Sequence, residues 1–96
     1  MIAESTLEKR LVKGVRELDC FIRKIQFISH RGCPDRLIIT PQGTLFWVEM
    51  KKKGGRLSTA QKREILTLKR HQQKVEVLSS VHEVDNFLEE LKCYLN

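Results

Sequence analysis

Residues 34–51 of this chain predict a β-hairpin with a short, defined turn. Two segments, 35–40 and 44–51, are rich in residues that favour strands. Between them, Pro41-Gln42-Gly43 suits a three-residue loop in which the glycine takes the left-handed conformation and forms a bulge. A hairpin with this loop has only one register, so the loop decides which side chains of the two strands face each other.

That register brings two carboxylates together. If Thr40 faces Thr44, Asp35 lies directly opposite Glu49, with Cβ atoms roughly 4.5–5.5 Å apart. The alternation of side chains along a strand places Lys51 on the same face as Glu49. Like charges opposed across a sheet are destabilising unless they are compensated, and a divalent cation bound by both carboxylates would compensate them. A two-residue loop would instead send the carboxylates to opposite faces.

The rest of the chain predicts three helices and two further strands. An amphipathic helix is expected over 4–19 and a strand over 20–29, with Phe21, Ile25 and Phe27 on one face. Capping boxes beginning at Ser58 and at Ser80 predict two more helices, separated by a strand at 75–78. The apolar stripes of the first and last helices are Leu7, Leu11, Val15 and Leu18, and Val84, Phe87, Leu88, Leu91 and Leu95. The predicted order is α-β-β-β-α-β-α, an α/β (α+β) chain with a mixed sheet flanked by helices.

Three motifs occur in a fixed order along the hairpin and the helix after it: Gly32-x-Pro34-Asp35, Glu49-x-Lys51, and Leu57-Ser58 followed by Gln61. In this order the chain resembles the VRR-NUC branch of the PD-(D/E)XK nucleases, and in particular the short stand-alone phage-type members. The resemblance runs through nearly the whole chain and implies one domain over 1–96 with a restriction-endonuclease-like αβββαβα core. It also implies a phosphodiesterase that depends on Mg²⁺ or Mn²⁺.

The resemblance and the hairpin geometry together give a set of site residues. The expected catalytic residues are Asp35, Glu49, Lys51 and Gln61, and the expected metal ligands are Glu8, Asp35, Glu49 and the Met50 carbonyl oxygen. The resemblance implies a glutamate from the first helix; Glu8 is preferred and Glu4 is the alternative. Either one also suits a helix-surface acid, since acids near a helix N-terminus are favoured by the dipole. Gln61 also has a structural interpretation, because it completes the S-x-x-Q capping box.

Three other residues near these motifs receive no catalytic role. His30 is interpreted as a surface residue, and Cys33 stands where the resembled family usually has a small apolar residue. Gln72 stands where family members often have a glycine that ends the second helix, so the end of that helix is not predicted.

Positive charge is concentrated in one part of the chain. Residues 50–74 carry nine Lys or Arg against Glu64 alone, a balance of +8, whereas 75–96 carry five acids against Lys92, a balance of −4. A nucleic acid is the expected partner of such a basic block, and a solvated basic surface is the alternative. The expected contacts to nucleic acid are Arg31, Arg36, Lys52, Lys53, Arg56 and Lys62.

Composition excludes several other classes of protein. No apolar run approaches the ~18–20 residues of a membrane span, and no signal-peptide pattern opens the chain. The three cysteines are odd in number and lack CxxC spacing, which predicts reduced thiols, a cytoplasmic location (the host cytoplasm for a phage protein) and no zinc site. Nothing in the sequence calls for an organic cofactor.

The function expected from these features is a metal-dependent DNA endonuclease that recognises DNA structure. It would act on duplex, nicked or branched DNA in replication, repair or recombination, and a homodimer would suit its small size. Two alternatives stay open: a module that binds DNA or RNA without cutting it, and a nuclease subunit that is active only within a larger complex.

Overall fold

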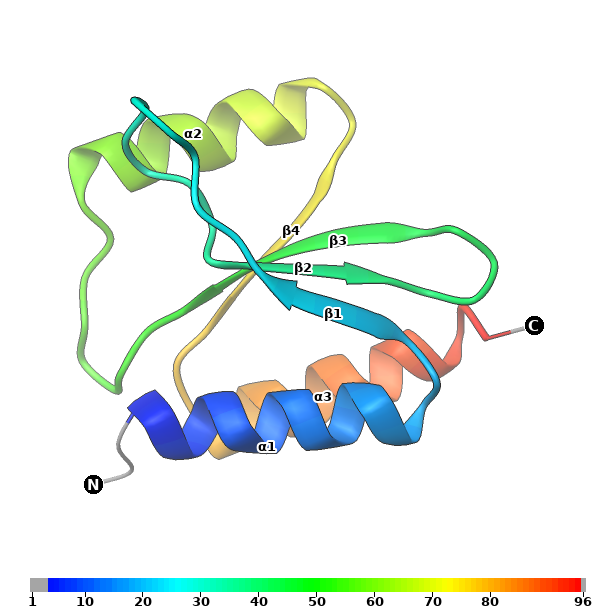
Figure 1. The fold of residues 1–96 in the computed structure, drawn as a ribbon. Coiled ribbons are helices and arrows are strands. Elements are labelled where there is room, and N and C mark those ends of the chain that lie inside the picture. Colours follow the sequence, from blue (N-terminus) through cyan, green and yellow to red (C-terminus); the bar gives the residue numbers. More distant parts are fainter. Residues whose placement is uncertain (1–3, 96) are drawn as a thin grey trace.

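The described chain folds into a sheet with helices on both sides (Figure 1). The computed structural model describes residues 4–95. The elements in chain order are α1 (Glu4–Glu17), β1 (Phe21–Lys24), β2 (Arg36–Ile39), β3 (Leu45–Met50), α2 (Thr59–Arg70), β4 (Lys74–Leu78) and α3 (Val81–Lys92). The predicted order of helices and strands is confirmed, and so is the mixed α+β class. No helix in this part of the chain combines the length and the apolar character needed to cross a membrane.

The sheet has the order β1-β2-β3-β4. β1 pairs antiparallel with β2, and β2 with β3, whereas β3 and β4 run parallel. Because a parallel pair needs a crossover, α2 connects β3 to β4. α1 and α3 lie together on one face of the sheet, and α2 lies on the opposite face (Figure 1).

The core lies between the sheet and the α1/α3 layer. Alternating residues of β3, Phe46 and Val48, are fully buried there, and the Phe46 ring meets the edge of Phe87 with centroids 5.5 Å apart. Both predicted apolar stripes enter this layer: Leu7, Leu11, Val15, Val84, Phe87 and Leu91 are buried, and Leu18, Leu88 and Leu95 pack against them partly buried.

The hairpin register predicted from the three-residue loop is confirmed. Arg36 pairs with Val48 and Ile39 with Leu45, which is the register that places Thr40 against Thr44. The Thr40 amide donates to the Thr44 carbonyl at 2.9 Å. Gly43 has a φ of 92°, a conformation that glycine adopts without steric cost.

The strand predicted over 20–29 was wrong in both length and facing. β1 covers only Phe21–Lys24, and it is Ile22 that is buried while Phe21 stays 43% exposed. Ile22 pairs with Ile38, so these two side chains share the face that α1 and α3 cover. The Ile25 amide still donates to the Asp35 carbonyl at 3.0 Å, and the chain then turns away from the sheet.

The helix termini follow the capping predictions with one correction. Ser58 and Gln61 form the complete capping box of α2. Ser80 caps α3, but the Glu83 carboxylate accepts from the amide and hydroxyl of Ser79 instead of the Ser80 amide, so the second box is incomplete. α2 ends at Arg70, and Gln72 takes a φ of 64° at the position where a glycine was expected from the resemblance.

Candidate active site

Glu49 lies on the face of the sheet that carries α2, and Asp35 lies at the same end of the hairpin. Arg36 pairs with Val48, and continuing this register by one residue sets Asp35 opposite Glu49. Thr40 and Thr44 are a hydrogen-bonded pair, so the alternation of an antiparallel ladder makes 35 and 49 a non-hydrogen-bonded pair, in which side chains lie closest. Glu49 is only 5% exposed. The register thus brings both carboxylates to the same end of the hairpin.

Pro34 interrupts the ladder directly beside this pair. The register would make Pro34 the hydrogen-bonded partner of Met50, but proline has no N–H to donate to the Met50 carbonyl. The Met50 amide donates instead to Asp35 Oδ1 at 3.1 Å. The N–H and C=O of one strand residue point to the same neighbouring strand, so the Met50 carbonyl is directed toward Asp35.

The environment of Asp35 resists ionisation. Burial raises the pKa of this carboxyl above its usual range, and the nearby Glu8 charge adds to the increase. The Met50 amide and the Arg36 guanidinium act in the opposite direction but do not cancel the effect of burial on this pKa. A carboxylate held in this way gains from a neighbouring cation.

Lys51 extends the site beyond Glu49. Its Nζ lies 3.9 Å from Glu49 Oε2, and its backbone amide donates to the Leu78 carbonyl at 2.9 Å. The second contact fixes the end of β3 to β4, so the lysine is positioned by the sheet before the chain enters the turn at 52–55. Its ammonium can therefore approach charge that develops beside Glu49.

Gln61 makes both of the contacts that its two interpretations require. Its Oε1 accepts from the Ser58 backbone amide at 2.8 Å, and the Gln61 backbone amide donates to Ser58 Oγ at 3.1 Å. The nitrogen of the same side-chain carboxamide, Nε2, donates to Glu49 Oε2 at 3.2 Å. One side chain thus caps α2 and fixes the start of that helix to the carboxylate pair.

Gly32 allows α2 to approach the hairpin this closely. It has a φ of 91°, and a Cβ atom here would collide with the Ala60 carbonyl and lie 2.9 Å from the Gln61 amide nitrogen. The far end of α2 is held by Gln73, whose Oε1 accepts from Trp47 Nε1 at 2.9 Å. The first glycine of the GxPD motif is therefore a packing requirement for the position of Gln61.

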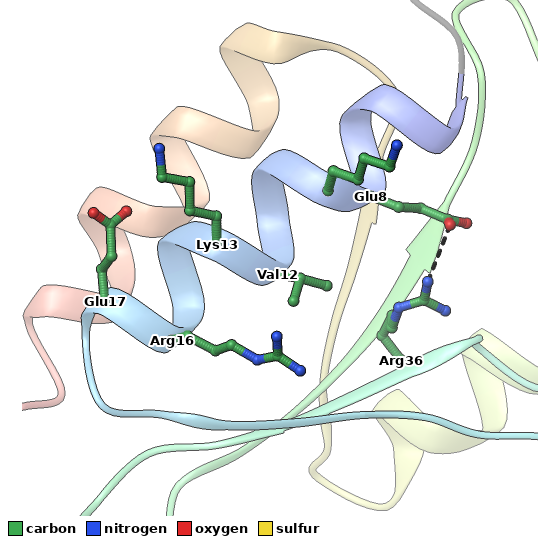
Figure 2. Close-up of a pocket in the computed structure, with 7 residues that line it drawn as sticks. Glu8, Val12, Lys13, Arg16, Glu17 and Arg36 are labelled. Atoms are coloured by element: carbon green, nitrogen blue, oxygen red, sulfur yellow. Dashed lines mark ion pairs between the residues drawn. The ribbon is translucent and has the colours of Figure 1, made fainter.

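Glu8 is held by Arg36 (Figure 2). Nη1 of Arg36 also lies 3.9 Å from Asp35 Oδ2. Glu8 Oε2 lies 3.1 Å from Arg36 Nη2, and Nη1 of the same guanidinium donates to the Asp35 carbonyl at 3.1 Å. Arg36 is only 6% exposed, so it stands between α1 and the start of β2 as an internal cation. Glu4, the alternative to Glu8, has a side chain outside the described residues.

The contact between Glu8 and Arg36 was missed at the level of sequence, although the strand alternation contains the signal. Arg36 has the parity of Ile38 and the opposite parity to Asp35, so it must point to the face that α1 covers. Within residues 4–95, no group of three or more His, Cys, Asp or Glu side chains is arranged to hold a metal ion.

The remaining residues singled out from the sequence differ in exposure. Five of the six expected nucleic-acid contacts are exposed, namely Arg31, Lys52, Lys53, Arg56 and Lys62, whereas Arg36 is buried. His30 is exposed and its Nε2 lies 3.0 Å from Glu64 Oε1. Burial raises the pKa of the Cys33 thiol to about 11, which keeps it protonated at neutral pH.

Comparison with known proteins places this arrangement in a family. The VRR-NUC domain profile matches residues 4–82, which include the whole site. The chain belongs to the VRR-NUC family. A VRR-NUC domain of known structure superposes with a TM-score of 0.84 at 28% sequence identity, covering 90% of this chain and 94% of the other.

A phage protein is also similar in sequence to this VRR-NUC chain. "Putative nuclease p44" of Acyrthosiphon pisum secondary endosymbiont phage 1 is 38% identical over 64 residues, which are 67% of this chain and 69% of the relative. The family, the shared fold and this relative identify the chain as a nuclease-type domain.

Proposed function

We propose that this VRR-NUC domain is a divalent-metal-dependent nuclease that hydrolyses phosphodiester bonds at the Asp35–Glu49 pair. The observation that supports this most strongly is the convergence of four side chains from three elements. Glu49 contacts both Gln61 Nε2 and, at 3.9 Å, Lys51 Nζ, and the amide of the next residue, Met50, donates to Asp35 Oδ1. This is an acid pair with one cation and one amide beside it.

The donor atoms fit Mg²⁺ or Mn²⁺. Both ions prefer oxygen ligands, and Mg²⁺ is commonly bound by one or two carboxylates while it keeps several waters. Asp35, Glu49 and the Met50 carbonyl would hold the ion, since proline at position 34 cannot supply the hydrogen bond that this carbonyl would otherwise accept. When bound, such an ion lowers the pKa of a water and neutralises charge on the phosphoryl group.

The side chains around the pair supply the other requirements of hydrolysis. Lys51 would stabilise negative charge that develops on the phosphoryl oxygens, or take up the proton of the attacking water. Gln61 would hold Glu49 and the water in position. Glu8 would join the ligands directly or through a water, which requires its carboxylate to leave Arg36 or to share it.

The proposed substrate is DNA recognised by its structure and backbone, in duplex, nicked or branched form. The exposed bases that were predicted as nucleic-acid contacts, Arg31, Lys52, Lys53, Arg56 and Lys62, would contact phosphates. We extend the proposal to an endonuclease of replication, repair or recombination that works inside the cell.

We also propose a homodimer. Four large apolar side chains of the described residues are exposed, namely Phe21, Ile28, Leu66 and Val77. Light scattering behind a sizing column would give twice the 11.3 kDa of the chain if this is correct. A monomer at high micromolar concentration would contradict it.

Cleavage assays test the proposed reaction. Labelled supercoiled plasmid and a four-way junction would be incubated with Mg²⁺, Mn²⁺ or EDTA, and Lys51→Ala and Asp35→Ala would be compared with the wild type. We expect cleavage that depends on the metal and falls by about 10²–10³ in Lys51→Ala, the usual cost of one charge-stabilising group. Lys92→Ala, on the exposed surface of α3, is the matched control.

Two outcomes would contradict the proposal. Undiminished metal-dependent cleavage in either active-site variant would show that the substituted residue is not needed for catalysis. Tight binding with no product in any metal would instead favour the binding module, or a nuclease that needs a partner.

A further inference from the structure

A hollow lies between α1 and the β1–β2 side of the sheet (Figure 2). It has a volume of about 640 Å³ and is lined mainly by Lys9, Val12, Lys13 and Arg16 of α1 and by Arg36 of β2. At one end of it, Glu8 contacts Arg36, whose own backbone follows Asp35 directly. We call this hollow the α1 groove. It borders the proposed active site and shares Glu8, a proposed metal ligand, with it.

The bases that α1 contributes to the groove have no acidic partner among the described residues. Lys9, Lys13 and Arg16 take part in no ion pair within residues 4–95. Arg10, on the other side of the same helix, makes a two-point contact with Asp85 of α3 at 2.8 and 2.9 Å. Positive charge on α1 is therefore neutralised toward α3 and left uncompensated toward the groove, where Glu17 is the one acid besides Glu8.

The basic surface continues past the α1 groove to the edge of the sheet. A second hollow of about 440 Å³ shares Val12, Arg16 and Arg36 with the groove and adds Arg23 and Lys24 of β1. β1 is an edge strand of the described sheet, so this end is open to solvent. A polyanion lying here could run from the edge of the sheet along α1 to Glu8.

We propose that the α1 groove binds the sugar-phosphate backbone of the substrate nucleic acid, on the part of the strand that leads away from the cleaved bond. This inference rests on the proposed nuclease function and extends it. Closely spaced lysines and arginines without partners bind phosphates with little regard to sequence. A nucleic acid is favoured over an acidic protein because the groove ends beside the site proposed to cut phosphodiesters.

The test compares a variant that loses positive charge from the groove with one that loses it elsewhere on an exposed helix surface. Lys13→Gln/Arg16→Gln removes charge from the groove, and the control, Lys92→Gln, removes it from the last turn of α3, outside the basic block of 50–74. Fluorescence anisotropy with a labelled 30-base-pair duplex in EDTA would be measured from 50 to 200 mM salt. The groove variant should bind about tenfold more weakly, and its slope of log K against log salt should fall by up to about 1.8, or 0.9 for each lost phosphate contact. The control should stay within threefold of the wild type.

Each outcome has a defined meaning. Suppose that the wild type binds and cuts DNA, but the groove variant and the control have equal affinity and equal salt slope. The proposed role of the groove would then be wrong, and the proposed nuclease function would stand. If the wild type binds no nucleic acid, both the proposed role of the groove and the proposed nuclease function are wrong.

A second measurement on the wild type guards against a variant that does not fold. Lysine acetylation, read by mass spectrometry with and without the duplex, should show Lys9 and Lys13 protected relative to Lys92 on α3. Equal acetylation of all three lysines in the complex would overturn the proposal.

Discussion

At the scale of single residues, Gln61 makes two contacts that substitution can separate. Its Oε1 and amide bond to Ser58, and its Nε2 bonds to Glu49. Ser58→Ala removes the cap alone, which costs about 1 kcal/mol of stability. Gln61→Ala removes part of the cap and the contact to Glu49.

We therefore expect both variants to lose a similar free energy of unfolding, but only Gln61→Ala to lose cleavage, by at least tenfold. Urea unfolding and cleavage rates on the same preparations would measure the two effects. Equal cleavage by the two variants would mean that Gln61 only caps the helix.

Asp35 gives a prediction about pH in the metal-free protein. Because its pKa is raised on folding, the native state binds this proton more tightly than the unfolded chain does. Its contribution to stability is therefore present below the ordinary pKa of an aspartate and is lost as the pH rises through the raised value. At higher pH the native protein carries a buried charge.

Asp35→Asn removes this charge but keeps an oxygen that can accept from the Met50 amide. In EDTA at pH 8, the variant should melt above the wild type by a few degrees, since 1 kcal/mol corresponds to roughly 4–8 °C in a domain of this size. The difference should shrink at pH 4. A variant that melts below the wild type at pH 8 would show that Asp35 stabilises the fold as an ion.

At the scale of elements, the position of α2 depends on Gly32. Alanine at this position would keep an unfavourable positive φ and would also collide with the first turn of α2. Gly43→Ala is the matched control, since its φ is 92° and nothing lies within 4 Å of a Cβ placed there.

Gly43→Ala should lose about 1 kcal/mol of unfolding free energy and keep its cleavage rate, because alanine there is strained only by the positive φ. Gly32→Ala should lose more stability and most of its cleavage, because Gln61 moves with the helix. Thermal melts and cleavage assays would measure both. Similar losses in the two variants would exclude the close approach as the cause.

The elements also show how far local patterns predict this fold. The hairpin register and the caps of α2 follow from short-range chemistry, and they were predicted correctly from Gly43 and Ser58. The facing of β1 was not, because apolar residues stand at both parities of 20–29 and only the pairing of Ile22 with Ile38 decides between them. Strand alternation places Arg36 on the face that α1 covers, but its partner Glu8 lies on another element, so the contact itself depends on tertiary packing.

At the scale of the whole molecule, charge and chemistry are divided among the layers. Glu49 of the carboxylate pair lies on the α2 side of the sheet, whereas the α1 groove lies on the α1 side, and Arg36 stands between them. A backbone bound on both sides would hold a substrate across the end of the hairpin. This arrangement agrees with recognition by shape and phosphate position, since the basic residues reach backbone charges.

Asp35 and Glu49 are proposed to bind one divalent cation together. Calorimetric titration of Mn²⁺ into the wild type, Asp35→Asn and Glu49→Gln tests this proposal without requiring a substrate. Glu76→Gln is the matched control, because this half-buried carboxylate lies beside Val48 on the opposite face of the sheet. Each site variant should weaken Mn²⁺ binding by at least tenfold, and the control should leave it unchanged. Equal Mn²⁺ affinity in all four proteins would contradict the proposal.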